Sequence, residues 1–308
     1  MSKNALKPVG IGVYGGDFTP TKGVLVDIPK DSYVELKHQV QAYLDTLGDT
    51  GMWLAGGGGS FDPEHPSNVE LNPETGKPYG TTKITSGDID VFMDSDLIKR
   101  KLGLETKMSD VDVKNTVLAH AQRHYPSVKG GNGIHIAWEA PGKTKGLQNY
   151  YQIDLMIMQH AHTIGKHHMH DYSVANSPYK GVDQQLAMSS LINSHPDYEP
   201  KELQYHGFGG KIQHRANKQV FSKDGKSPVT DIEHAAELAL GPGARWRDIS
   251  NVESIIKWFE RDNGPGIEHP RLAQLKADLE RKKAEMTKKT VKEGTADWFR
   301  HISQNLTI

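Results

Sequence analysis

Two short segments decide the fold of this chain: GGGGS at residues 56–60 and SGDIDVF at residues 86–92. The first follows a short apolar run at 52–55, which predicts a buried strand that enters a tight glycine turn. The second alternates polar and apolar residues, which predicts a strand whose successive side chains point to opposite faces. Asp88 and Asp90 therefore leave the same face, about 7 Å apart along the strand. A glycine turn suits a phosphate group, and paired carboxylates suit a divalent cation.

A third carboxylate lies in the apolar segment YQIDLMI at residues 151–157. Strand alternation places the neighbouring apolar residues on one face and Asp154 on the other. A charge in so apolar a strand is costly unless it is paired or binds a metal. An isolated Asp-x-Asp pair is usually an ordinary surface or salt-bridge feature, but three carboxylates converging on one face need a cation. Hard oxygen ligands favour Mg²⁺ or Mn²⁺.

Composition narrows the class of protein. A chain of 308 residues is long enough for two packed domains. It has no cysteine, which excludes disulfides, thiolate zinc sites and cysteine nucleophiles. Its 37 Lys/Arg and 38 Asp/Glu residues nearly balance, so no global field attracts nucleic acid. With no recognisable signal peptide and no long apolar run, we expect a cytoplasmic protein with no membrane partner.

The pattern along the chain predicts an N-terminal arm or edge strand at 1–30, a catalytic domain at 31–165 with an insertion at 61–86, and a mostly helical domain at 166–308. Helices are expected at 32–47, 97–102, 109–124, 230–240, 250–262 and 270–290, and another is expected to start at Ser177-Pro178. Strands are expected at 52–55, 88–93, 133–138 and 150–158, with a turn at 141–146 and a strand pair around Phe208 and Val220.

The order of these motifs resembles the nucleotidyltransferase superfamily of DNA polymerase beta: Gly-Ser, then Asp-x-Asp on a strand, then a single Asp on a later strand. The resemblance covers roughly residues 32–160 and includes Ser86-Gly87 directly before Asp88. It implies an α/β (α+β) fold, in which a mixed-sheet nucleotidyltransferase domain is followed by a mostly helical domain. The texture of the chain is also similar to that of a stand-alone phage-type member.

The resemblance assigns a role to each motif. It implies that Gly59 and Ser60 open a short helix that holds the β- and γ-phosphates. Asp88 and Asp90 would bind two metal ions, and Asp154 would complete the site of the ion that activates the acceptor and would take its proton. The segment between Ser60 and Asp88 is longer than the family usually has, which marks 61–86 as an insertion.

The implied reaction transfers an NMP from an NTP, with ATP favoured, to an acceptor hydroxyl and releases pyrophosphate. An RNA 3′ end, a protein hydroxyl and a small molecule all fit as the acceptor. Lys180 and Ser189 are further candidates for contact with the triphosphate, against the alternative of a surface lysine and a packing serine.

Two other features have competing interpretations. Five histidines lie at positions 160, 162, 167, 168 and 170. We interpret them as a solvated hinge between domains rather than a metal site, because nothing there sets a tetrahedral ligand spacing. A basic stretch at 211–226 fits a nucleic-acid or nucleotide-phosphate surface, but we favour a solvated face. The segment Arg245-Trp246-Arg247 fits a stacking platform, but we expect a buried Trp with solvated arginines.

Three rival functions stay open at this point. A metal-dependent nuclease and an Asp-x-Asp glycosyltransferase are rival enzyme classes, although the glycine-serine turn and the third aspartate argue against both. The non-enzymatic rival is a catalytically degenerate nucleotidyltransferase-fold protein that acts as a binding or structural protein. The intact set of three aspartates argues against it.

Overall fold

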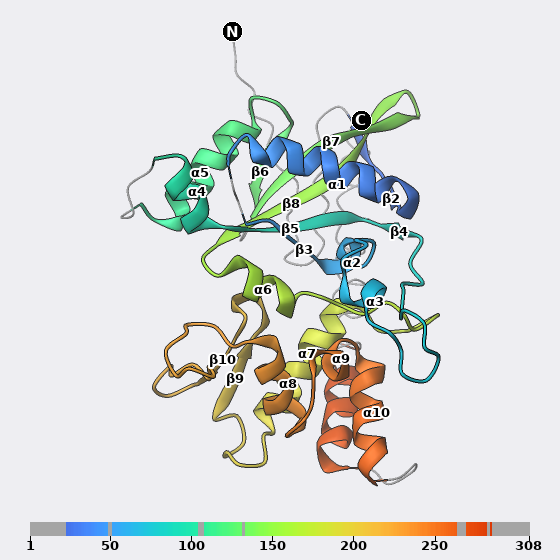
Figure 1. The fold of residues 1–308 in the computed structure, drawn as a ribbon, viewed down its shortest axis with the longest axis vertical. Coiled ribbons are helices and arrows are strands. Elements are labelled where there is room, and N and C mark those ends of the chain that lie inside the picture. The colour runs from blue at the N-terminus through green and yellow to red at the C-terminus, as the bar shows by residue number, and fades with distance from the viewer. Residues whose placement is uncertain are drawn as a thin grey trace, which may run out of the picture.

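The computed structural model describes residues 23–48, 51–103, 108–130, 133–263, 269–281 and 284. These residues form two packed units, a sheet with covering helices and a mainly helical unit below it in the view of Figure 1. Residues 1–22 of the predicted N-terminal arm lie outside the described residues. The end of the predicted helix at 270–290 also lies outside them. Among the described residues, no helix is long and apolar enough to span a membrane.

The first unit is built on a mixed sheet in the order β3-β5-β8-β7-β6. Its central pair, β5 and β8, is parallel, and the other neighbours along this path are antiparallel. The short strand β1 runs parallel to the first part of β8, beyond the start of β5, so part of the predicted N-terminal segment is an edge strand. The bounds are β1 Gly23–Leu25, β3 Trp53–Ala55, β5 Asp88–Asp94, β6 Ser127–Gly130, β7 Gly133–Thr144 and β8 Leu147–Met158.

One face of this sheet is covered by three helices, α1 Lys30–Asp45, α4 Ser95–Lys101 and α5 Asp110–Ala121. Their apolar side chains form one core with the apolar face of the strands, including Ile89, Val91 and Ile153. The strand alternation read from the sequence is therefore confirmed: the apolar set points into this core. The opposite face is left to the aspartates and to contacts with the second unit.

The second unit has its own hydrophobic core, formed mainly by helices. The mixed sheet followed by a mostly helical part confirms the predicted fold class, whereas the domain limits at 165 and 166 stay a prediction. A further helix starts at residue 270 and is described to residue 281. The other elements are α6 Ala161–His167, α7 Gly181–Asn193, β9 Leu203–His206, η1 Gly207–Gly209, β10 Lys211–His214, α8 Ile232–Leu240, α9 Trp246–Ile249 and α10 Val252–Asn263.

Three local predictions were wrong. Helix α7 begins at Gly181 rather than at Ser177-Pro178, because the hydroxyl of Ser177 bonds Glu253 and the backbone N–H of Tyr179 in an extended approach. Phe208 lies in the turn η1 between β9 and β10, not in a strand. The strand β7 continues through a bulge to Thr144. The turn predicted at 141–146 is therefore only two residues long, Lys145 and Gly146.

The segment at 61–86 is mostly irregular, as predicted, and it makes contacts with both units. It contains only α3 Pro66–Val69 and β4 Thr85–Ser86, which pairs with β2 Ile28–Pro29. Glu70 accepts hydrogen bonds from Arg247 of the second unit at 2.6 and 3.1 Å. Arg247 is therefore not the solvated cation that the sequence predicts, although its neighbour Trp246 is buried as expected.

Candidate active site

The three predicted carboxylates converge on the face of the sheet opposite the main core. Asp88 and Asp90 extend from β5, and Asp154 extends from the adjacent parallel strand β8, where it is the direct register partner of Asp90. One oxygen atom from each of the three lies within 4.8 Å of the others. Among the described residues, no other group of three or more His, Cys, Asp or Glu side chains is arranged closely enough to hold a metal ion.

The electrostatics of this cluster favour a bound cation. Burial raises the pKa of Asp88 to about 6, with a further contribution from the charge of Asp154. The pKa of Asp90 is raised well above its usual value by burial and then by both neighbouring aspartates. Carboxylates so close together disfavour their own ionisation. A set of three carboxylate oxygens fits Mg²⁺ or Mn²⁺, which prefer hard ligands and would relieve this repulsion.

Asp154 is held by two neighbours that sequence reasoning missed. Gln152 donates to both carboxylate oxygens of Asp154 at 3.1 Å, and His135 Nδ1 lies 2.7 Å from Oδ1. The hydrogen bond to Asp154 raises the pKa of His135, against the effect of burial. The signal for His135 was present in the sequence, because it stands between Ile134 and Ile136 in an alternating strand. Its polar side chain had to lie on the same face as the aspartates.

The glycine turn packs directly against the acidic strand through its first residues. Gly56 has a φ of +65°, and a Cβ atom there would lie 1.9 Å from Oδ2 of Asp90. At Gly58 a Cβ atom would lie 2.7 Å from the carbonyl oxygen of Asp88. Glycine is therefore required at this close approach, both for the left-handed backbone and for the space.

The expectation that Gly59 and Ser60 open the short helix is wrong. Helix α2 spans Gly56–Gly59, so Gly59 is its last residue and Ser60 follows it. The fully buried hydroxyl of Ser60 donates to the carbonyl oxygen of Gly57 at 2.9 Å and lies 3.3 Å from Oγ1 of Thr81. The helix starts at Gly56, three residues before the expected Gly59, because Gly56 has the left-handed conformation that turns the chain. Gly56 and Gly57 thus take the place beside the carboxylates.

Lys180 lies near this site, together with a second lysine that the sequence did not single out. Lys83 has its ammonium group 4.4 Å from the centre of the Tyr172 ring. A Cβ atom on Gly57 would lie 2.3 Å from its Nζ atom. Burial lowers the pKa of Lys83; Asp88 and Asp90 oppose this effect, and the charge of Lys180 adds to it. Lys83 lies in the irregular segment, where no period marks a residue as facing a site.

The contact of Ser189 with the triphosphate stays a prediction. Ser189 lies nine residues beyond Lys180 on α7, which corresponds to about 13 Å along the helix axis. The histidine segment also differs from the solvated hinge that was expected. His167 is buried, with Nε2 2.7 Å from the carbonyl oxygen of Thr230, and His170 is buried beside Gln184. These two side chains are packing elements of the second unit.

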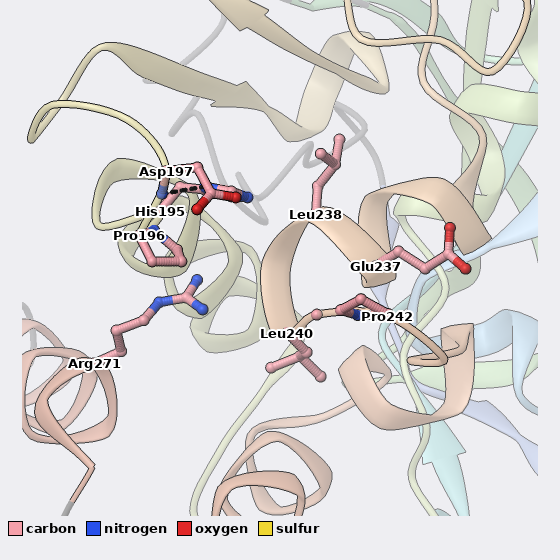
Figure 2. Close-up of a pocket in the computed structure, with 9 residues that line it drawn as sticks. His195, Pro196, Asp197, Glu237, Leu238, Leu240, Pro242 and Arg271 are labelled. Carbon is pink, nitrogen blue, oxygen red and sulfur yellow. Dashed lines mark hydrogen bonds between the residues drawn. The ribbon is translucent and has the colours of Figure 1, made fainter.

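A cavity of about 380 Å³ lies in the second unit and contains none of the three aspartates. Figure 2 shows Arg271 and the α8 segment around Leu240 on its walls. The guanidinium of Arg271 donates to the carbonyl oxygens of Leu191 and Ala239 at 2.9 and 2.6 Å. Arg271 therefore links α7 to α8 from a wall of this cavity.

No protein-family profile matches the chain, and no curated protein sequence matches it. Among solved structures it is similar to polymerase beta of Leishmania infantum in a ternary gap complex, with a TM-score of 0.35 and 11% identity over 73% of this chain. That match spans 66% of the polymerase chain, just under two thirds of its length. The ternary P/T complex of the same polymerase gives the same TM-score and identity and covers 72% of its chain. At this level of similarity, function has to be inferred from the carboxylate site itself.

Proposed function

We propose that this protein is a metal-dependent nucleotidyltransferase that transfers an NMP from an NTP to an acceptor hydroxyl and releases pyrophosphate. The observation that carries the proposal is the convergence of Asp88, Asp90 and Asp154 within 4.8 Å on adjacent parallel strands. ATP is the favoured donor, and RNA, a protein or a small molecule is the acceptor. Membership of the polymerase beta superfamily and a phage-type origin belong to the same proposal.

The three aspartates would hold Mg²⁺ or Mn²⁺, which when bound would neutralise charge on the phosphate groups and on the acceptor oxygen. We assign the acceptor proton to Asp154, whose carboxylate is held in place by hydrogen bonds to Gln152 and His135. Holding this geometry in advance lowers the entropic cost of bringing the acceptor and donor together.

The backbone of Gly56 and Gly57 lies against Asp90 and Lys83, where a triphosphate bound at the carboxylates would extend. The absence of side chains there lets phosphate oxygens approach the backbone N–H of Gly57 closely. The N–H of Gly56 is already used, because it donates to the carbonyl oxygen of His168 at 3.1 Å. Lys180 contributes a positive charge from the start of α7, which supports its predicted role at the phosphates. In this proposal Gly57, rather than Gly59 and Ser60, contacts the phosphates.

The proposal is tested by label transfer. The protein is incubated with each α-³²P-labelled NTP, Mg²⁺ or Mn²⁺, and either RNA or protein extract as acceptor. We expect label in one acceptor class for the wild type and for Asp45→Ala, which removes an exposed carboxylate at the end of α1. The double variant Asp88→Ala/Asp90→Ala is expected to transfer none. Equal labelling by wild type and the double variant would refute the mechanism.

A thermal-shift measurement separates an enzyme from a structural protein. An active site of this kind predicts that NTPs stabilise the wild type only when a divalent cation is present. A degenerate protein that acts as a scaffold would show no metal-dependent stabilisation by any NTP.

A further inference from the structure

The described residues include no carboxylate in ion-pair contact with the positively charged Lys83. In the described part of the chain, its ammonium group makes no hydrogen bond or ion pair, and its one close contact of this kind is with the ring of Tyr172 at 4.4 Å. The side chain is only partly exposed and reaches the backbone of Gly57, beside the carboxylate cluster. A half-buried ammonium without a counter-ion has lost part of its hydration without full compensation.

Charges of both signs act on Lys83. Asp88, Asp90 and then Asp27 favour its charged form, and Lys180 acts on it as a second cation. Two neighbouring ammonium groups repel each other, as do the three carboxylates. An anion between the lysines and a cation between the carboxylates would relieve both repulsions together. A polyphosphate chelated by a divalent metal ion is a single ligand that supplies both charges.

The position of Lys83 is set by the second unit. The adjacent residue Thr82 donates to the carbonyl oxygen of Tyr172 through its backbone N–H and its hydroxyl, both at 2.8 Å. The Tyr172 ring then lies under the ammonium group, an arrangement that contributes a cation–π attraction. These contacts fix the backbone of the irregular 61–86 segment beside the site, so Lys83 has a defined position.

We propose that Lys83, together with Lys180, forms the subsite for the β- and γ-phosphates, the portion of the NTP that leaves as pyrophosphate. This inference rests on the proposed function for the identity of the ligand. The inference assigns a function to the 61–86 segment. This segment contributes the positively charged side chain of Lys83, which neither the strands nor the glycine turn provide. Substrate binding would then depend on the contact between the segment and the second unit.

The test uses Mg²⁺ with inorganic tripolyphosphate, measured by calorimetry on the full chain. Lys83→Met is expected to weaken binding at least tenfold, Lys180→Met is expected to weaken it as well, and Lys83→Arg is expected to recover part of the loss. Lys77→Met, which removes an exposed lysine of the same segment, is the matched control and is expected to bind as the wild type does. Far-UV circular dichroism and melting temperatures check that each variant is folded.

Mn²⁺ binding alone, followed by electron paramagnetic resonance, separates substrate contact from simple charge balance. If Lys83 contacts phosphate, Lys83→Met binds Mn²⁺ as tightly as the wild type or more tightly, while tripolyphosphate binding falls. Unchanged tripolyphosphate affinity in Lys83→Met, or no binding by the wild type, would overturn the inference even where wild-type label transfer is observed. Lys83-dependent binding without any label transfer would instead overturn the proposed reaction and leave the anion subsite standing.

Discussion

Asp90 and Asp154 are direct neighbours in the parallel register of β5 and β8, so two carboxylates face each other across adjacent strands. The same row continues with Ala55 opposite Asp90 on β3 and His135 opposite Asp154 on β7. Adjacent strands lie about 4.8 Å apart, a distance at which like charges are destabilising. The row thus combines a small residue, two acids and a histidine in an arrangement that a bound cation would stabilise.

The stability of the metal-free protein should fall as the pH rises through the range in which these acids ionise. A carboxyl group whose pKa is raised in the folded state binds protons more tightly there, so it favours folding at low pH and opposes it once ionised. For Asp88 this window runs from about pH 4 to about pH 6. We expect the melting temperature in EDTA to decrease across it, and Mg²⁺ or Mn²⁺ to restore stability above it.

Asp90→Asn should flatten that decrease and raise the metal-free melting temperature near pH 7 by roughly 2–4 °C, the shift that accompanies about 1 kcal/mol. The same variant should lose label transfer and metal-dependent stabilisation. Differential scanning fluorimetry across pH checks both. A metal-free wild type whose stability is flat from pH 4 to 7 would contradict the expectation.

Gly56→Ala should abolish metal-dependent stabilisation and activity. Its new Cβ atom would displace the Asp90 carboxylate, and the left-handed φ adds about 1–2 kcal/mol of strain. The matched control is Gly76→Ala, because Gly76 has a φ of +64° but open space around its Cβ position. We expect the control to lose similar backbone stability and to keep metal binding, which calorimetry with Mn²⁺ measures. Equal metal binding by the two variants would show that Gly56 does not hold Asp90 in place.

His135→Gln should destabilise the protein by about 1–3 kcal/mol, because the buried Asp154 loses one of its partners. The hydrogen bond raises the pKa of His135, so its contribution is complete below the unfolded value of 6.5 and declines as the pH rises through the folded value. Urea unfolding should therefore give a larger loss at pH 6 than at pH 8.5. His38→Gln, on the exposed side of α1, should change little at either pH. A loss that is the same at both pH values would mean that the charged form of His135 adds nothing.

Arg247→Met should destabilise the protein by about 3 kcal/mol. Its guanidinium lies 2.9 Å from Asp171, whose side chain is only 2% exposed and would lose this partner. The bond to the more exposed Glu70 is expected to contribute little by comparison. Arg245→Met, at an exposed position two residues away, should stay within about 0.5 kcal/mol of the wild type. Similar unfolding midpoints for the two variants would exclude a role for the buried pair.

Local patterns predicted the strands β3, β5, β7 and β8 and most of the longer helices, because these elements depend on periods of two and 3.6 residues that neighbouring side chains display. Asp94 caps α4 by accepting bonds from the N–H groups of Asp96 and Leu97, so this helix begins with a local signal. The errors lie where a local signal competes with tertiary contacts. Ser177-Pro178 is a sound helix start in isolation, but the bond from Ser177 to Glu253 of α10 holds that segment extended.

The sequence by itself determined that Asp88 and Asp90 share a face and that Asp154 is a lone charge on an apolar strand. A strand's two-residue period produces this result whatever surrounds it. Only the tertiary structure decided that β5 and β8 are parallel neighbours in the register that pairs Asp90 with Asp154. It also decided that Gly56, rather than Ser60, meets the acids and that Lys83 lies beside them. These outcomes depend on which distant segments become neighbours in the folded chain, and no local period specifies such non-local contacts.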